Sequence, residues 1–130
     1  MATNKIYNQS GGTIGGKFTV LKTVVDCTDG LAVGDFATDL VVPANSFVLN
    51  AFIGNVDNDL ASSGAATLNV KVGSTAIFAT AEAITGLKGT GALEVEDGTI
   101  TTEDSVVSLT VGTAALTAGT VTVGVTILTL

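Results

Sequence analysis

The sequence contains no histidine, no arginine and no tryptophan, and it has one cysteine, Cys27, and one proline, Pro43. Without histidine and with a single thiol, tetrahedral zinc sites and Ser-His-Asp or Cys-His catalytic arrangements are excluded. Cys27 cannot form an internal disulfide, which is typical of synthesis in a reducing compartment. No histidine or arginine is available to lower its pKa, so we expect an inert small residue.

Positive charge is also scarce, with five lysines against twelve acidic residues and a net charge of −7. Nucleic acids and anionic membrane surfaces both require clustered basic residues, so neither is expected as a partner. No apolar run approaches the roughly 18 residues of a membrane span, and the first residues lack the apolar stretch of a signal peptide. We therefore expect a protein made in a cytoplasm, whose acidity keeps it soluble.

Apolar residues are abundant at 46% of the 130 positions, although only 5% are aromatic. One domain of this length can bury a self-sufficient core. Valine and threonine are frequent, and β-branched residues favour strands. No segment of useful length has helical periodicity. The composition therefore predicts an all-β domain.

The clearest strand signal is the final stretch, 119–130. Val121, Val123, Val125 and Ile127 alternate with threonines and Gly124, so one face should be buried and the other more polar. An uncharged strand of this length invites aggregation unless its edges are paired. We expect strands on both sides of it and a second layer over its valines.

Further strands are predicted at 18–26, 38–42, 47–53, 66–72 and 107–111. Pro43 should end the second of these because it lacks an N–H. Segments 92–96 and 99–102 resemble a hairpin around Asp97-Gly98, with Leu93 and Val95 facing inward and Glu94 and Glu96 facing water. Eight or nine short strands indicate an antiparallel β-sandwich, jelly-roll-like, over residues 17–130.

Residues 1–16 are polar and glycine-rich, with Ile6 and Tyr7 as the main apolar anchors. Such a segment cannot bury enough apolar area to order by itself. It is either a flexible N-terminal arm free in solution or an arm that orders on a neighbouring subunit.

The sequence offers only weak candidates for a metal-binding or catalytic group of residues. Asp57 with Asp59, or Asp26 with Asp29, could offer oxygen ligands to Ca²⁺, but solvated turn residues are the simpler interpretation. Acidic residues at 94–97 and 103–104 could supply a glycosidase pair, but more plausibly charge a sheet edge against self-pairing. No phosphate-binding loop is present, because the glycines at 11–16 lack the Gly-Lys-Ser/Thr ending. We expect no catalytic residue, metal or cofactor.

Three segments resemble small structural proteins of tailed bacteriophages, the capsid decoration (cement) and head-fibre proteins. They are LVVPANSFVL at 40–49, GAATLNVKVG at 64–73 and LTAGTVTVGV at 116–125. The resemblance covers roughly residues 17–130. It implies a β-sandwich or jelly roll, often trimeric, that sits on the capsid exterior and cements the major capsid protein subunits, with no catalytic residues.

Strands 18–25 and 47–53 carry apolar side chains on both faces, so one face of each should contact another subunit. The expected contact residues to capsid protein or to a second copy are Ile6, Tyr7, Phe18, Val48, Phe52, Leu128 and Leu130. The alternative is a carbohydrate- or receptor-binding module of a phage fibre, which requires aromatic residues clustered on one exposed face. Aromatic residues are few, namely Tyr7 and five phenylalanines, and Phe18, Phe47 and Phe52 are expected to serve the core.

Overall fold

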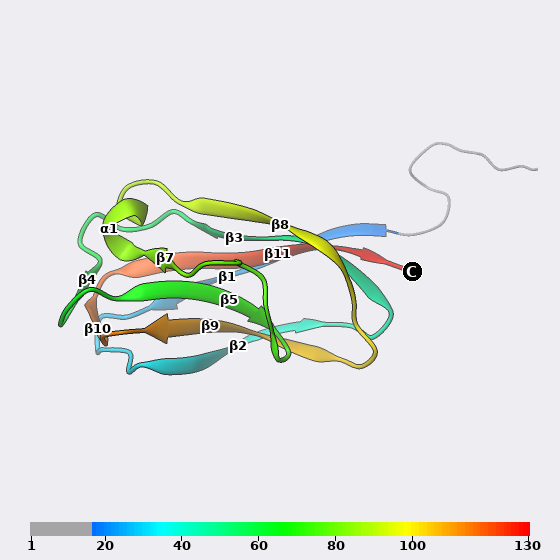
Figure 1. The fold of residues 1–130 in the computed structure, drawn as a ribbon, viewed down its shortest axis with the longest axis horizontal. Helices are drawn as coiled ribbons and strands as arrows, with labels where there is room; N and C mark the ends of the chain where they lie inside the picture. Colours follow the sequence, from blue (N-terminus) through cyan, green and yellow to red (C-terminus); the bar gives the residue numbers. More distant parts are fainter. Residues whose placement is uncertain (1–16) are drawn as a thin grey trace, which may run out of the picture.

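The computed structural model describes residues 17–130, without the side chains of Lys17 and 95–98. Every strand pair in this range is antiparallel, and the one helix there is a single turn (Figure 1). The elements are β1 (Lys17–Asp26), β2 (Gly34–Val42), β3 (Ser46–Gly54), β4 (Ala61–Ser62), β5 (Thr67–Val72), β6 (Thr75–Ala76), β7 (Glu82–Ala83), α1 (Ile84–Leu87), β8 (Ala92–Ile100), β9 (Ser105–Gly112), β10 (Leu116–Ala118) and β11 (Thr120–Thr129).

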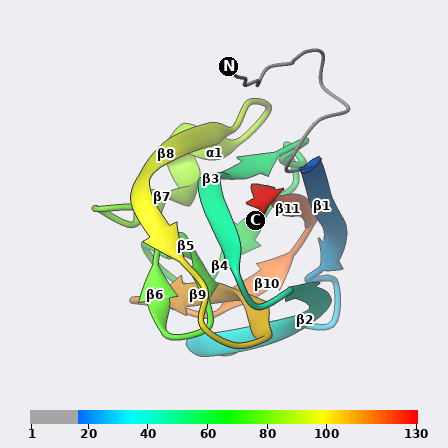
Figure 2. The ribbon, with the colours of Figure 1, turned by 90° about the vertical axis from the view of Figure 1, so that its right-hand side faces the viewer.

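Two sheets form the sandwich. Sheet A has the strand order β1-β11-β3-β8, and sheet C has the order β2-β9-β5-β6, with β7 pairing beyond β5. Figure 2 views this sandwich from one end. When the eight principal strands are numbered along the chain, the two sheets read 1-8-3-6 and 2-7-4-5. This is the topology of an eight-stranded jelly roll, so the predicted fold class is confirmed.

Strand β11 is central in sheet A, as the sequence predicts. It pairs with β1 from Thr120 to Thr129 and with β3 on its other edge. Val121, Val123, Val125 and Ile127 are all buried, facing the apolar side chains of sheet C across the core. The β5 alternation is also confirmed, because Leu68, Val70 and Val72 are buried and the residues between them are half-buried.

Strand β3 departs from simple alternation at Leu49. Thr126 of β11 pairs with Asn50 and the next residue, Ile127, pairs with Val48, so Leu49 is an extra residue in a β-bulge. The bulge resets which face each side chain takes. Val48 is therefore fully buried together with Ala51 and Ile53, whereas Phe47 is only half-buried.

The predicted hairpin around Asp97-Gly98 is wrong, because both of its segments belong to the single strand β8. Residues 92–100 follow β3 throughout, and a register irregularity between Val48 and Asn50 accommodates the extra residues. The predicted facing is also wrong for Leu93, which pairs with Phe52 and is 61% exposed, and for Glu94, which pairs with the buried Ala51 and is half-buried. The predicted strand 38–42 does end before Pro43, but it begins earlier, at Gly34.

Connecting segments between the strands extend the core. Their buried side chains are those of Val56, Leu60, Ile77, Phe78, Ile84 and Leu87. Backbone bonds anchor these segments, including Ile77 N–H to the Val70 carbonyl at 2.8 Å and Gly89 N–H to the Val56 carbonyl at 3.0 Å. Cys27 is also fully buried, and burial raises the pKa of its thiol, as does the neighbouring Asp26 carboxylate. No helix within residues 17–130 has the length and apolar character to cross a membrane.

Candidate interaction surface

The outer face of sheet A carries apolar side chains that the core does not use. Partners in antiparallel strands share a face, so the register places the outward residues in rows across the sheet. One row is Phe18–Leu128–Phe47–Ile100, another contains Val20, Thr126 and Asn50, a third is Lys22–Gly124–Phe52–Leu93, and the last contains Val24, Thr122 and Gly54. We call the apolar members the apolar face: Phe18, Val20, Val24, Phe47, Phe52, Leu93, Ile100 and Leu128.

Exposure on the apolar face is high for a sheet in water. Phe18 is 69% exposed, Val24 62% and Leu93 61%, and Val20 and Ile100 are at least half exposed. Among the side chains described on these rows, Lys22 is the only charged one. Contiguous exposed apolar side chains mark protein–protein or ligand contact sites. As far as its side chains are described, the face is therefore suited to binding another surface without desolvating carboxylates.

Gly124 shapes the middle of the apolar face. A Cβ at this position would lie within contact distance of the Phe52 ring and 2.6 Å from the Leu21 carbonyl oxygen. The phenyl ring therefore lies across the β11 backbone, in the space that the glycine leaves free. This packing holds Phe52 half-buried.

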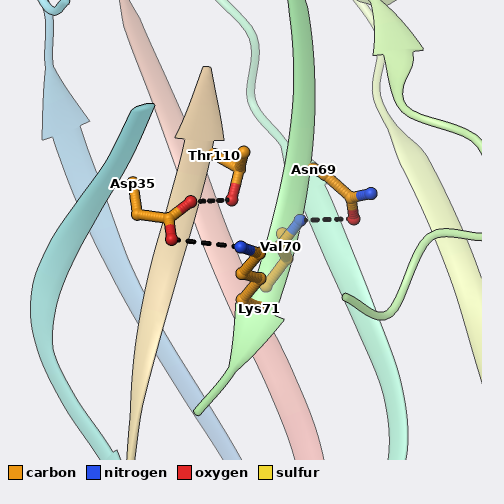
Figure 3. Close-up of polar contacts among 5 residues, drawn as sticks. All are labelled: Asp35, Asn69, Val70, Lys71 and Thr110. Carbon is orange, nitrogen blue, oxygen red and sulfur yellow. Dashed lines mark hydrogen bonds and ion pairs between the residues drawn. The ribbon is translucent and has the colours of Figure 1, made fainter. Parts of the chain in front are cut away.

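The outer face of sheet C is more polar, with polar side chains on three neighbouring strands (Figure 3), although Val41 and Val106 are also exposed on it. Asp35 of β2 accepts a hydrogen bond from the Thr110 hydroxyl of β9 at 2.7 Å and pairs with the Lys71 ammonium of β5 at 3.1 Å. Asn69 and Ser108 lie on the same face in register with these residues. The two outer faces of the sandwich thus differ in chemistry, and sheet C presents the one that suits solvent.

The Asp35 contacts predict a pH dependence of stability. The hydrogen bond from Thr110, followed by the one from Lys71, holds the pKa of Asp35 below its ordinary value of 3.8. A carboxylate whose pKa is lower in the folded state stabilises the fold above the unfolded pKa, and this contribution is lost as the pH falls through the folded pKa. In Asp35→Asn the melting temperature should therefore be lower than wild type at neutral pH, and the difference should shrink below pH 3.8.

Thermal melts followed by circular dichroism between pH 7 and pH 2 would measure this difference. Asp39→Asn, on the same exposed strand, controls for the loss of one negative charge. A difference between wild type and Asp35→Asn that stays constant across the range would contradict the prediction.

The predicted contact residues are distributed unevenly. Phe18, Phe52 and Leu128 lie on the apolar face. Leu130 follows β11 at the Phe18 end and is 64% exposed, with its N–H donating to the Asn45 carbonyl at 3.0 Å. Val48 is a wrong prediction, because the bulge at Leu49 turns it into the core. Ile6 and Tyr7 lie outside the described residues.

Five members of the apolar face were not among the predicted contacts: Val20, Val24, Phe47, Leu93 and Ile100. The signal for the first two was present in the sequence, since Phe18, Val20 and Val24 alternate with the inward residues of the same strand. The expectation that Phe18, Phe47 and Phe52 serve the core is wrong, because all three lie on the outward rows of sheet A, Phe18 exposed and the other two half-buried.

Leu128 and Leu130 allow a test of the end of β11. A chain that ends after Ile127 should stay folded, because Val121, Val123, Val125 and Ile127 keep their place in the core. This shorter chain lacks Leu128 of the apolar face. We therefore expect weaker association and a loss of unfolding free energy of about 1–2 kcal/mol. Urea titration and sedimentation velocity measure the two effects. A chain ending after Thr129 is the control, and an unfolded 1–127 chain would assign Leu128 to the core instead.

The acidic turns use their carboxylates locally. Asp57 accepts the N–H of Asp59 at 2.9 Å, and Asp26 accepts the N–H of Thr28 at 2.9 Å. The Thr28 hydroxyl also donates a hydrogen bond to the Asp26 carboxylate. Both bonds lower the pKa of Asp26, and the bond from the hydroxyl contributes more than the one from the N–H. No group of three carboxylate or thiol side chains suited to a metal occurs among the side chains that the structure describes. These contacts are those of Asx turns.

The strand order and the unequal outer faces define the class of this protein: an eight-stranded jelly-roll sandwich with one apolar outer sheet. No protein-family model matches the sequence, and no curated protein does. A solved structure that is similar is a chain of the cyanophage Pam1 capsid asymmetric unit, with a TM-score of 0.69, 22% sequence identity and 99% of each chain covered. At this identity the likeness shows a shared fold.

Proposed function

We propose that this chain is a non-enzymatic structural protein of a tailed-phage virion. It decorates the capsid exterior and binds across major capsid protein subunits, and its own copies associate, with a trimer as the favoured state. The apolar face of sheet A is the observation that carries this proposal. The full-length likeness to a chain from a phage capsid asymmetric unit supports the virion assignment.

The arrangement of the two outer faces supports a decorating role. The apolar face would be buried against neighbouring subunits, and the sheet C face with Asp35, Lys71 and Thr110 would remain in solvent. A net charge of −7 keeps the unassembled protein soluble, while the nearly uncharged apolar face lets it dock. Many copies on one capsid would make individually weak contacts effective together through avidity.

Co-sedimentation with capsids of the phage that encodes the protein is the direct test. The expected result is saturable binding to expanded capsids, with an oligomer seen by sedimentation equilibrium. A chain that remains monomeric at all concentrations and leaves capsids unbound would overturn the proposal.

A carbohydrate- or receptor-binding module is the second candidate, and one observation favours it. Phe18, Phe47 and Phe52 share the apolar face, and aromatic rings on an open face are the feature this function needs. Among the described side chains, the polar groups beside them are few, namely Lys22, Asn50 and the outward threonines of β11. Binding on a glycan array that is lost in Phe18→Ala would support this candidate, and an array without hits would remove it.

A further inference from the structure

One edge of sheet A is open within residues 17–130. Strand β1 forms this edge, and no other strand of that range pairs with its outer side (Figure 2). The Cys27 N–H, directly after β1, donates to the Gly119 carbonyl at 2.8 Å, on the side of β11. Since N–H and C=O groups alternate between the two sides of a strand, the odd-numbered residues of β1 bond to β11. The even-numbered residues turn their N–H and C=O groups to the free edge, and they are Phe18, Val20, Lys22, Val24 and Asp26.

The other edges of the two sheets have features that discourage pairing with a further strand, and β1 does not. Strand β2 has a register irregularity between Ala37 and Val41, and β8 has one opposite Val48 and Asn50. Strands β6 and β7 have only two residues each. By contrast, β1 has ten residues and no proline, and it pairs with β11 without a break in register. A long, regular edge with apolar side chains invites the addition of another strand.

A groove lies beside this edge, between β1 and β2. It has a volume of about 270 Å³, and its lining includes Thr23, Val25, Phe36 and Asp39. Phe36 is 40% exposed, although it pairs with the buried Leu109 and so faces the interior. In a strand added to β1, the residues opposite Thr23 and Val25 would point inward, because cross-strand partners share a face. A free edge beside a pocket for alternate side chains is the arrangement with which sheets bind extended peptides.

The charges on this side favour a strand of different sequence over a second copy of β1. Two antiparallel β1 strands that pair through all five outward-turned residues would place Lys22 opposite Lys22 of the second copy. Like charges directly opposite each other are destabilising, whereas opposite charges are stabilising. Two copies would also bring their grooves together, and Asp39 is the charged residue among the described lining of each. A strand with a carboxylate opposite Lys22 avoids both penalties.

We propose that an extended segment of the major capsid protein pairs with the free edge of β1 as a fifth strand of sheet A. This inference rests on the proposed function and specifies one contact through which the chain holds the capsid. The segment carries a carboxylate opposite Lys22 on the outer side, and an apolar side chain opposite Thr23 that enters the groove. Because Phe18, Val20 and Val24 of β1 belong to the apolar face, the added strand continues that face.

Hydrogen exchange of residues 17–26, resolved to single amides by mass spectrometry, tests this pairing directly. In the free chain the even-numbered amides should exchange fast and the odd-numbered ones slowly, since only the latter bond to β11. On expanded capsids of the phage that encodes the protein, the even-numbered amides should slow by about tenfold or more. Docking through the apolar face alone would leave these amides in solvent at the edge, and they would stay fast.

Proline at Lys22 provides a second test. Lys22→Pro removes one outward N–H and no bond to β11, and proline is tolerated where the N–H of an edge strand faces solvent. This variant should bind capsids about tenfold more weakly than Lys22→Thr, which keeps the N–H. Lys22→Glu should also bind more weakly than Lys22→Thr, because it opposes two carboxylates. Thr23→Pro removes an N–H that bonds to β11 and should lower the melting temperature, which checks the orientation of β1.

Bound wild-type chains with fast even-numbered amides would overturn this inference and leave the proposed function intact, as would equal binding by Lys22→Pro and Lys22→Thr. Wild-type chains that leave capsids unbound would overturn both. Even-numbered amides that are already slow in the free chain would also overturn it. Slowing that grows with concentration would assign the edge to a second copy, and constant slowing would assign it to the chain itself. The exchange measurement needs no variant, so it decides the question even if Lys22→Pro does not fold.

Discussion

Replacing Val20 by lysine is expected to weaken binding to capsids by about thirtyfold or more, without unfolding the domain. Val20 lies in the middle of β1 on the apolar face and is 57% exposed, so a lysine is readily accommodated in the unassembled chain. In the complex its ammonium would be buried against an apolar partner surface. A loss of 2 kcal/mol, the threshold of an interface hot spot, corresponds to about thirtyfold in affinity. Co-sedimentation over a concentration series gives the affinity directly.

Val106→Lys is the matched control for this experiment. Val106 is a strand valine that is 40% exposed, but it lies on sheet C, opposite Val41. The same substitution there should leave capsid binding within about twofold of wild type, as expected for a surface change outside the interface. If Val106→Lys weakens binding as strongly as Val20→Lys, or if only Val106→Lys does, the apolar face is not the docking surface. Equal melting temperatures of both variants would show that folding is intact.

Gly119→Ala is expected to destabilise the fold by about 3 kcal/mol or more, the largest effect that we expect from adding one methyl group. Gly119 has φ of +95°, and a Cβ there would lie 2.5 Å from the Leu60 Cα and 2.8 Å from the Leu60 nitrogen. These are backbone atoms, which cannot move aside as a flexible side chain can. Gly119 also accepts the Cys27 N–H at 2.8 Å, so any shift disturbs the start of β11. Urea unfolding measures the change.

Gly86→Ala controls for the loss of a glycine as such. No atom lies within 4 Å of a Cβ at Gly86, and this residue is inside the helical turn α1, where alanine is favoured by up to about 1 kcal/mol. This variant should be as stable as wild type or more stable. A Gly119→Ala protein with wild-type stability would mean that β11 and the loop at Leu60 lie farther apart than the structure places them.

Strands with unbroken alternation could be predicted from the sequence. In β5 and β11, every second residue is apolar, and burial follows that pattern because nothing interrupts the pleat. The pattern fails where an extra residue enters a strand. The sequence around Leu49 does not show a bulge, because a bulge is set by pairing with β8 and β11, and such partners are distant in sequence. For the same reason Asp97-Gly98 was mistaken for a hairpin turn.

The candidate surface was predictable only in part. Apolar residues on both faces of β1 indicate that both faces make contacts, but the sequence does not say which face belongs to the core. That choice depends on Val25, which packs with Val121 inside the sandwich and leaves Phe18, Val20 and Val24 outside. Leu93 and Ile100 join them only through pairing with β3. The buried Ile77, Phe78, Ile84 and Leu87 were missed because irregular segments have no periodicity to read.

The bulge at Leu49 also determines where this chain can change length. Elsewhere in a paired strand, removing one residue sends all the following side chains to the opposite face. If Leu49 were deleted, the side chains of Val48, Asn50 and Ala51 would point to the core, to the outer face and to the core in turn. These are the faces that they already occupy. A one-residue deletion at this point would therefore preserve the facing of both halves of β3. Relatives of this protein that differ in length within the strand should carry their gap at this position.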